Sequence, residues 1–121
     1  MKSTKELQDA VNNFPGIFSI GDLQGNSVAL SPQLPALLGY TPEEYLAKHF
    51  LDFVHPDDHQ FVMSEMQSLS KDGAVTRSIQ QRWRRKDGAY IWLEWKARAS
   101  NGLVYATATD ITKAKIGRAH V

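Results

Sequence analysis

Residues 75–100 most constrain what this chain can fold into. They form two runs in which apolar and polar side chains alternate, joined by Lys86-Asp87-Gly88. An Asp-Gly pair between two such runs is typical of a hairpin, because glycine readily adopts the positive φ that a tight turn requires. An alternation of period two places one set of side chains on a buried face and the other set in solvent. The sequence therefore predicts a long antiparallel hairpin.

The parity of the two runs identifies the face that is expected to be buried. This face should carry Val75, Ile79, Gln81, Trp83, Ile91, Leu93, Trp95, Ala97 and Ala99. The opposite face is mostly charged, and we expect cross-strand pairs on it such as Arg82 with Glu94. A third alternating run, 103–109, follows the turn pair Asn101-Gly102. The three runs together predict an antiparallel meander.

The segments before the hairpin predict short helices and two strands. A helix is expected over 3–13, with Ser3 and Glu6 in capping-box spacing, followed by strands at 17–20 and 28–30. Further helices should begin at Ser31-Pro32, with Ser31 as the cap, at Thr41-Pro42, and at Pro56, the last running to about Leu69. This order predicts an α+β fold: a five-stranded antiparallel sheet with helices packed on one face.

The first predicted helix carries an apolar stripe of Leu7, Ala10, Val11 and Phe14. A lone helix of this length is marginal in water, so the stripe needs a surface to cover it. The stripe can lie on its own domain or on a second chain. Because the outer face of the predicted sheet is largely charged, we expect it to cover only part of the stripe. We therefore predict a two-fold homodimer through the stripe, aided by Trp92.

Composition excludes several kinds of chemistry. The chain of 121 residues has no cysteine, which rules out disulfides, thiolate metal sites and cysteine nucleophiles. His55 and His59 have i, i+4 spacing, but Pro56 favours a local hydrogen-bonding role at a helix start over a metal site. No phosphate-binding loop or catalytic triad pattern is present, so we expect no enzyme activity. No apolar run approaches a membrane span, and we expect a cytoplasmic protein without membrane insertion.

The basic hairpin offers an alternative function. Arginine and lysine side chains alternate there with Trp83, Trp92 and Trp95, as in modules that bind single-stranded nucleic acid. Parity separates the three indoles, however, with Trp83 and Trp95 on the buried face and Trp92 among the charges. A stacking platform needs several aromatic rings on one open face, and the net charge is only +1. A solvated strand face, with no nucleic-acid partner, is therefore favoured.

Four stretches resemble the PAS domain of the bacterial signalling type with its PAC motif. They are L-L-G-Y-T-P-E-E-Y at 37–45, F-V-H-P-D-D at 53–58, R-W-R-R-K-D-G-A-Y-I-W-L-E at 82–94 and D-I-T-K-A-K at 110–115. Their order and spacing carry the resemblance, which covers residues 14 to 115. It implies a non-catalytic sensory module that binds a small ligand, dimerises, or both, and relays a signal to a downstream effector domain. Histidine kinases, diguanylate cyclases and phosphodiesterases are such effectors in the family.

The resemblance also implies a division of the chain. Residues 1–14 would form an N-terminal helix, 15–112 the sensor domain, and 113–121 the start of a linker to the effector or a tail. No effector of these kinds fits within 121 residues, so a sensory fragment of a two-component or similar regulator is expected. Asp110, Ile111 and Thr112 match the family's signature at the junction through which the signal leaves the domain.

Two cofactors of the family are not expected here. Members that bind haem ligate its iron with a histidine in the middle of the long helix, where this chain has Phe61-Val62-Met63. Members that form a flavin–thiol bond use a cysteine, which this chain lacks. We therefore expect a colourless protein without a cofactor.

A mainly apolar ligand pocket is expected between the inner face of the sheet and the helices. Its predicted lining is Val28, Leu38, Phe53, Val54, Met63, Met66, Ile79, Gln81, Trp83, Leu93, Trp95 and Ala106. Gln81 is the most informative of these, because a buried amide needs hydrogen-bond partners. A backbone partner and a ligand both remain open for it. If no ligand binds Gln81 and no partner is orphaned, replacement by leucine should be tolerated.

Overall fold

The computed structural model describes residues 3–119, and the side chains of residues 3–116. The elements are α1 (Thr4–Asn12), β1 (Ile17–Asp22), β2 (Ser27–Leu30), α2 (Gln33–Leu38), α3 (Pro42–Leu46), α4 (His59–Gln67), β3 (Ile79–Arg84), β4 (Tyr90–Ser100), β5 (Leu103–Asp110) and α5 (Thr112–Ala119). Short 3-10 helices lie at Phe50–Asp52, Pro56–Asp58 and Ser68–Ser70. The outermost parts of the expected end segments 1–14 and 113–121 fall outside the described residues. No helix within residues 3–119 is long and apolar enough to cross a membrane.

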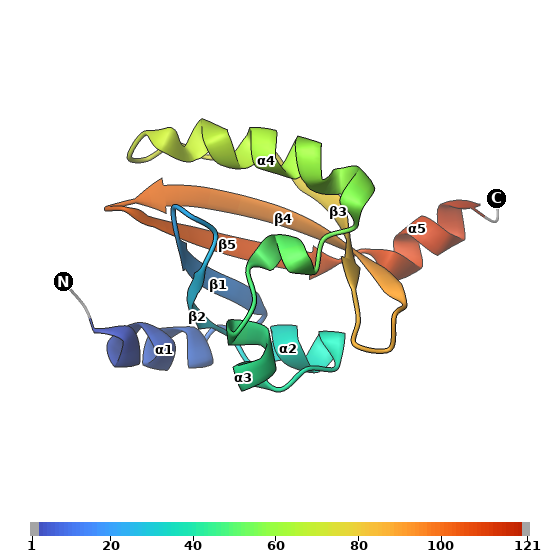
Figure 1. The fold of residues 1–121 in the computed structure, drawn as a ribbon, viewed down its shortest axis with the longest axis horizontal. Helices are drawn as coiled ribbons and strands as arrows, with labels where there is room; N and C mark the ends of the chain where they lie inside the picture. Colours follow the sequence, from blue (N-terminus) through green and yellow to red (C-terminus); the bar gives the residue numbers. More distant parts are fainter. Residues whose placement is uncertain (1–2, 120–121) are drawn as a thin grey trace.

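The five strands form one antiparallel sheet in the order β2-β1-β5-β4-β3. This confirms the predicted α+β fold and the β3–β4–β5 meander. Figure 1 shows α4 running along one side of the sheet and α5 projecting from its end, with the two chain ends on opposite sides of the molecule. The sheet therefore lies between α4, which packs along it, and α5, which extends beyond its end.

The hairpin confirms the predicted parity for β3 and β4 but not for the residues before them. Ile79, Trp83 and the odd-numbered residues of β4 are buried. Val75 is 55% exposed and Thr76 is buried, which is the reverse of the predicted alternation. Strand β3 begins only at Ile79, and Val75 makes an isolated bridge to Arg98. The predicted inward position of Val75 is therefore wrong, because the backbone between residues 76 and 78 is not strand.

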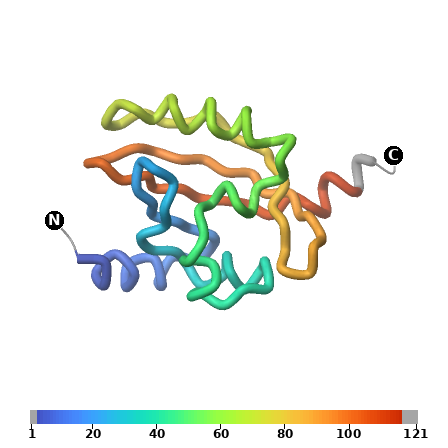
Figure 2. The backbone as a smooth tube through the Cα atoms, in the orientation of Figure 1, coloured from blue at the N-terminus to red at the C-terminus, as the bar shows by residue number. Residues whose placement is uncertain are grey.

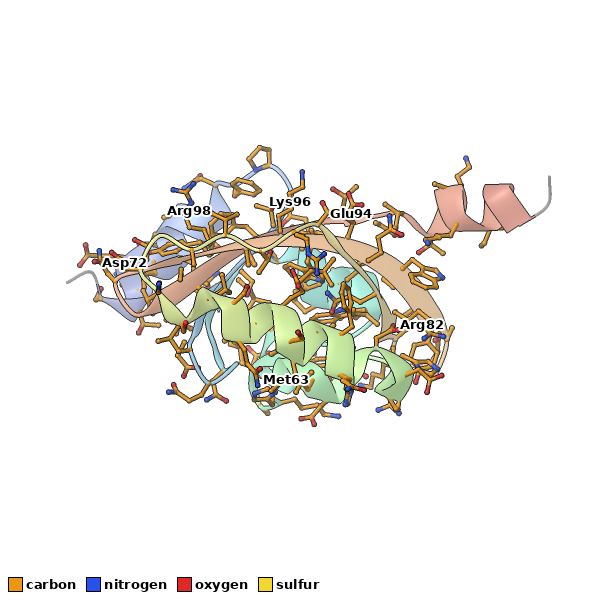
Figure 3. The ribbon with its side chains drawn as sticks, turned by 90° about the horizontal axis from the view of Figure 1, so that it is seen from above. Met63, Asp72, Arg82, Glu94, Lys96 and Arg98 are labelled. Carbon is orange, nitrogen blue, oxygen red and sulfur yellow. The ribbon has the colours of Figure 1, made fainter. Side chains whose placement is uncertain are left out.

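The predicted pair of Arg82 with Glu94 is also wrong. Glu94 lies opposite Gln80, whose Nε2 donates to Glu94 Oε2 over 3.1 Å. Arg82 lies opposite Trp92 and pairs instead with Asp58 at the start of the α4 region. In Figure 3, Glu94, Lys96 and Arg98 lie along the face of the sheet turned away from α4. The outer face of the hairpin is thus polar as predicted, but its side chains pair with other residues than expected because the strand register differs.

Helix α1 covers the outer face of the sheet at its other edge. The capping box of Ser3 and Glu6 is present as expected. Leu7 and Val11 are buried against Ile20 and Ala29, with Phe18, Val28, Leu103 and Tyr105 around them. Phe14 packs on Phe18 with ring centroids 4.7 Å apart. The part of the outer face on β1, β2 and β5 is apolar, so it covers the stripe that a second chain was expected to cover.

Because the sheet of the same domain covers the apolar stripe of α1, the stripe does not need a second chain to cover it. Leu7 and Val11 are occupied within the domain, and Ala10 is exposed beside them. Gln8 also fixes the helix, since its Nε2 donates to Leu30 O over 2.8 Å and its Oε1 accepts from the Leu30 N–H over 3.2 Å. That amide shields the free edge of β2, a position that invites pairing with other chains. A two-fold contact would have to use other residues than Leu7 and Val11.

The main core fills the opposite, inner face of the sheet. Phe53 lies at its centre, stacked on Tyr45 with centroids 4.7 Å apart and on Trp83 at 5.7 Å. Leu34, Leu38 and Val62 bring α2 and α4 onto the same cluster. Ser31 does not cap α2 as predicted; it is fully buried, and its Oγ accepts from the Phe18 N–H over 2.9 Å. Ser31 thus connects the end of β2 to β1.

Candidate functional site: a small internal cavity

A cavity of about 80 Å³ lies between the inner face of the sheet, α3, α4 and the β1–β2 turn. A volume of this size accommodates roughly three water molecules, because each occupies about 30 Å³ in the liquid. Its lining is mainly apolar and consists of Ser19, Gly21, Asp22, Gly25, Asn26, Ser27, Tyr45, Phe50, Val62, Met66, Ile79, Gln81, Trp83, Trp95, Ala97, Val104 and Ala106. The cavity therefore sits where a small ligand would contact the helices and residues of all five strands.

The structure brings part of the predicted lining together. Met66, Ile79, Gln81, Trp83, Trp95 and Ala106 line the cavity. Leu38, Phe53, Val54 and Leu93 are buried in the core around it without reaching it. Two residues were placed wrongly. Val28 packs in the α1 cluster, and Met63 is 40% exposed and points away from the sheet in Figure 3.

The main omission from the predicted lining is the β1–β2 turn. Residues 25–27, with Gly21 and Asp22, close one side of the cavity, and Tyr45 and Phe50 close another. Alternation in β1 places Ser19 on the same face as Ile17, so Ser19 could have been found by parity. The turn could not, because its position depends on contacts with a segment more than twenty residues away.

Those contacts are made by His49 and Phe50. His49 Nδ1 accepts from the Leu51 N–H over 3.2 Å, so the other nitrogen, Nε2, donates to Gln24 O over 2.6 Å. The Phe50 N–H donates to Gly25 O over 3.4 Å. Figure 2 shows the β1–β2 turn and the segment after α3 running side by side. The wall of the cavity is thus held by hydrogen bonds between two loops.

Gln81 and Trp83 form the polar pair of the inner face. Gln81 is only 2% exposed, and its Oε1 accepts from Trp83 Nε1 over 2.9 Å. The partner is therefore a neighbouring side chain, not the backbone group that was one of the two expectations. Trp95 differs from Trp83: its Nε1 is buried and has no hydrogen-bond partner among the described residues. The indole N–H of Trp83 therefore has a hydrogen-bond acceptor, whereas that of Trp95 has none among the described residues.

Replacing Gln81 with leucine should now cost stability, because the substitution orphans the buried Trp83 N–H. We expect Gln81→Leu to lower the free energy of unfolding by about 2 kcal/mol in urea denaturation. In a Trp83→Phe background, which already lacks the donor, the same substitution should cost markedly less. An equal cost in both backgrounds would show that the hydrogen bond between the two side chains is not what Gln81 contributes.

The ionisable groups of the lining carry little available charge. Burial raises the pKa of Tyr45 above its ordinary value, and a hydrogen bond with Ser27 offsets only part of that rise. Burial would also raise the pKa of Asp22, but hydrogen bonds from Asn26 and Gln24 outweigh it and hold this pKa below its ordinary value. Asp22 Oδ1 accepts from both of those backbone N–H groups over 2.9 Å. Tyr45 is therefore neutral, and the Asp22 carboxylate is engaged within its own turn.

The predicted exit residues fasten α5 to β4. The Trp92 N–H donates to Thr112 Oγ1 over 2.9 Å, and the Ile111 N–H donates to Trp92 O over 2.9 Å. Thr112 is oriented in turn by Asp110, whose Oδ1 accepts from the Thr112 N–H over 3.0 Å and from its hydroxyl over 2.6 Å. Lys115 Nζ lies 4.5 Å from the centroid of the Trp92 ring. The first turn of α5 is thus attached to one residue of β4.

The histidines at the start of α4 have local partners. His55 Nδ1 accepts from the Asp57 N–H over 3.0 Å, and His59 Nε2 lies 2.7 Å from Val54 O. Within the described part of the chain, no group of three or more histidine, cysteine, aspartate or glutamate side chains could hold a metal ion. These contacts match the local role expected for His55 and His59.

The indoles do not form a stacking platform on the hairpin. Trp83 and Trp95 are buried on the inner face. Trp92 lies on the outer face, where the Arg82 guanidinium carbon is 5.4 Å from its ring centroid and Lys115 Nζ is closer still. Two of the three rings are therefore inaccessible to a base, and the third is engaged by cations of the domain itself. The nucleic-acid alternative has no support in this arrangement.

Comparison with known proteins agrees with this architecture. The family model described as PAS fold matches residues 27–106. The aryl hydrocarbon receptor nuclear translocator homolog of Drosophila melanogaster is 31% identical over 77 residues, which cover 64% of this chain and 12% of that protein. Among curated relatives the chain spans between 12% and 21% of their length.

Two solved structures show the same fold. The PAS domain of an HTR-like protein from Haloarcula marismortui superposes with a TM-score of 0.73 at 20% identity, covering 89% of this chain and 96% of that one. The PAS-B domain of Drosophila melanogaster Cycle, with bound ethylene glycol, has a TM-score of 0.66 at 19% identity and covers 78% and 98%. Both share with this chain the antiparallel sheet with helices packed against it. This chain belongs to the PAS family.

Proposed function

We propose that this PAS domain is a non-catalytic sensor in which a small ligand, bound in the internal cavity, alters the sheet and is read out by α5. The observation that carries the proposal is the position of β4. On its inner face Trp95 lines the cavity, and three residues earlier Trp92 holds α5 from the outer side. A strand is stiff over three residues, so a displacement of Trp95 also moves the attachment of α5.

Arg82 connects a second element to the same junction. Its Nη2 lies 2.8 Å from Asp58 Oδ1 at the start of the α4 region, and its guanidinium packs on the Trp92 ring. Met66 and Val62 of α4 line the cavity. A ligand that displaces α4 therefore acts on Trp92 through Arg82 as well as through β4. In the longer protein that the resemblance implies, α5 would pass this change to an effector such as a kinase or cyclase.

The relay can be tested with ethylene glycol, the additive bound by the Cycle PAS-B domain. Its addition should shift the backbone amide resonances of cavity residues and, together with them, those of residues 112–116. Thr112→Val removes the acceptor of the Trp92 N–H at a cost of about 1 kcal/mol of stability. In this variant we expect the cavity resonances to respond as before and the response of α5 to fall.

Thr109→Val is the matched control, since Thr109 is an exposed residue of β5 outside the junction. It should respond like the wild type in both regions. An undiminished α5 response in Thr112→Val, or no α5 response in the wild type when the cavity resonances do shift, would contradict the proposed route.

A further inference from the structure

Most of the cavity lining is closed to solvent. Val62, Ile79, Trp83 and Trp95 are buried, on α4 and on the inner face of the sheet. Asn26, in the β1–β2 turn, is the one lining residue that is exposed. A small molecule that approaches from solvent therefore first meets the cavity at this turn.

Two loops meet at this side of the cavity, the β1–β2 turn and the segment that follows α3 (Figure 2). Gly25 of the turn and Phe50 of the other segment both line the cavity and are half-buried. Hydrogen bonds join the loops: His49 Nε2 donates to Gln24 O over 2.6 Å, and the Phe50 N–H donates to Gly25 O over 3.4 Å. Neither bond belongs to a helix or to the β-ladder, so the loops can separate without the unfolding of an element.

The β1–β2 turn is held together by its own hydrogen bonds. Asp22 Oδ1 accepts from the N–H groups of Gln24 and Asn26 over 2.9 Å each, and the Asp22 N–H donates to Asn26 O over 2.9 Å. The pairing of β1 with β2 is irregular between Ile20 and Gly21, where the turn joins the regular ladder. An irregularity of this kind locally disrupts a ladder, so the turn can tilt there as one body.

His49 holds the two loops together and also caps the 3-10 helix at Phe50–Asp52. Its Nδ1 accepts from the Leu51 N–H over 3.2 Å, while its Nε2 reaches Gln24 O. These two contacts can be separated by substitution. Asparagine is a preferred N-cap residue, so His49→Asn keeps an acceptor for the cap, but it has no atom in the place of Nε2.

We propose that the contact between Gly25 and Phe50 is the gate through which a small molecule enters the cavity, and that His49 keeps this gate closed by its bond to Gln24 O. This inference rests on the proposed function, because it assigns the entry route of the ligand. The gate controls how fast a ligand enters and leaves. It does not set the affinity, since the closed protein remains the dominant state with the same lining.

Acrylamide, a small neutral quencher of tryptophan fluorescence, measures entry into the cavity. In a Trp92→Phe parent protein the tryptophan fluorescence comes from Trp83 and Trp95, which both line the cavity. We expect His49→Asn to raise the quenching rate constant of these indoles about fivefold, which is the effect of one lost hydrogen bond on the open population. The affinity for ethylene glycol, measured from the amide shifts of lining residues, should stay within about twofold of the parent value.

His55→Asn is the matched control, because His55 Nδ1 makes the same kind of cap to the Asp57 N–H and His55 does not line the cavity. Its quenching should equal that of the parent protein. Equal quenching in all three proteins, or an equal rise in both variants, would overturn the gate. If ethylene glycol shifts no amide of the lining in the parent protein, the ligand-binding part of the proposed function is overturned, while the quenching still decides the gate.

Hydrogen exchange in the wild type tests the gate even if His49→Asn does not fold. The Phe50 amide, which donates to Gly25 O, should exchange through a local opening that low urea concentrations do not promote. The Ala97 amide, which donates to the buried Thr76 Oγ1, should instead follow global unfolding. Exchange of the Phe50 amide through global unfolding alone would mean that the gate does not open in the folded protein.

Discussion

Asp58→Ala is expected to lower the free energy of unfolding by about 3 kcal/mol at neutral pH. Asp58 Oδ2 accepts from the Arg82 backbone N–H over 2.8 Å and from Nε over 3.1 Å, and Oδ1 accepts from Nη2 over 2.8 Å. Both side chains are mostly buried, with 16% of Asp58 and 28% of Arg82 exposed. Removing one partner of such a pair leaves an uncompensated charge and an unpaired N–H, which costs far more than losing a surface ion pair.

Asp57→Ala is the matched control, because Asp57 occupies the same turn with 78% of its side chain exposed. It should cost less than about 1 kcal/mol. Urea denaturation followed by tryptophan fluorescence measures both variants. Similar losses in the two variants would show that the start of α4 is held by general charge effects near the helix end and not by the Arg82 pair.

The same pair predicts how stability depends on pH. Burial alone would raise the pKa of Asp58, but the hydrogen bonds and charge of Arg82 outweigh it and hold the pKa below the ordinary value of 3.8. A depressed pKa in the folded state stabilises the protein above the ordinary pKa, and this contribution disappears as the pH falls through the folded value. The stability gap between wild type and Asp58→Asn should therefore be full at pH 7 and narrow as the pH falls below about 4.

The hairpin was predictable because its periodicity is a local property. Each inward residue of β4 follows from the alternation alone, and the buried partners Ile79 and Trp83 follow from the same rule. The rule fails at Val75 because α4 intervenes there. Glu65 of α4 accepts from the Arg77 N–H over 3.3 Å, replacing the strand partner that residue would otherwise need. A long-range side-chain contact of this kind has no signature in the local pattern.

Register was harder to predict than parity. The last hairpin pair is Arg84 with Tyr90, so the loop that joins the strands is longer than the Asp-Gly turn, and the Arg85 N–H donates to Ala89 O across it. That loop length puts Gln80 and not Arg82 opposite Glu94. The freed Arg82 then pairs with Asp58. The ion pair of Arg82 with Asp58 could therefore not be predicted, because the assumed register of the hairpin was wrong by two residues.

The α4 stripe and the cavity wall show two further limits. Val62, Glu65 and Leu69 form the buried side of this segment, whereas Met63, which was expected to line the cavity, is 40% exposed. A buried glutamate masks the helical period, because charged residues are counted as solvent-facing. The cavity wall fails for another reason: the β1–β2 turn is positioned by His49, which belongs to a different loop.

That wall depends on Gly25, and Gly25→Ala is expected to cost about 3 kcal/mol. Gly25 has φ of 94°, a region in which a residue with a Cβ is strained by roughly 1–2 kcal/mol. A Cβ there would also overlap the His49 imidazole and lie 2.9 Å from Phe50 Cε1. Moving His49 breaks its bond to Gln24 O, so the loss should exceed the backbone strain alone.

Gly88 separates the two contributions. Its φ of 93° matches that of Gly25, yet nothing lies within 4 Å of its would-be Cβ. Gly88→Ala should therefore cost only the backbone term, roughly 1–2 kcal/mol. The difference between the two variants in urea denaturation measures what packing against His49 and Phe50 contributes to the cavity wall. Faster hydrogen exchange of the Phe50 amide, which donates to Gly25 O, should accompany the loss in Gly25→Ala but not in Gly88→Ala. Equal losses of unfolding free energy in the two variants would contradict this prediction. They would mean that His49 and Phe50 move aside at little energetic cost, so that this wall of the cavity is easily deformed.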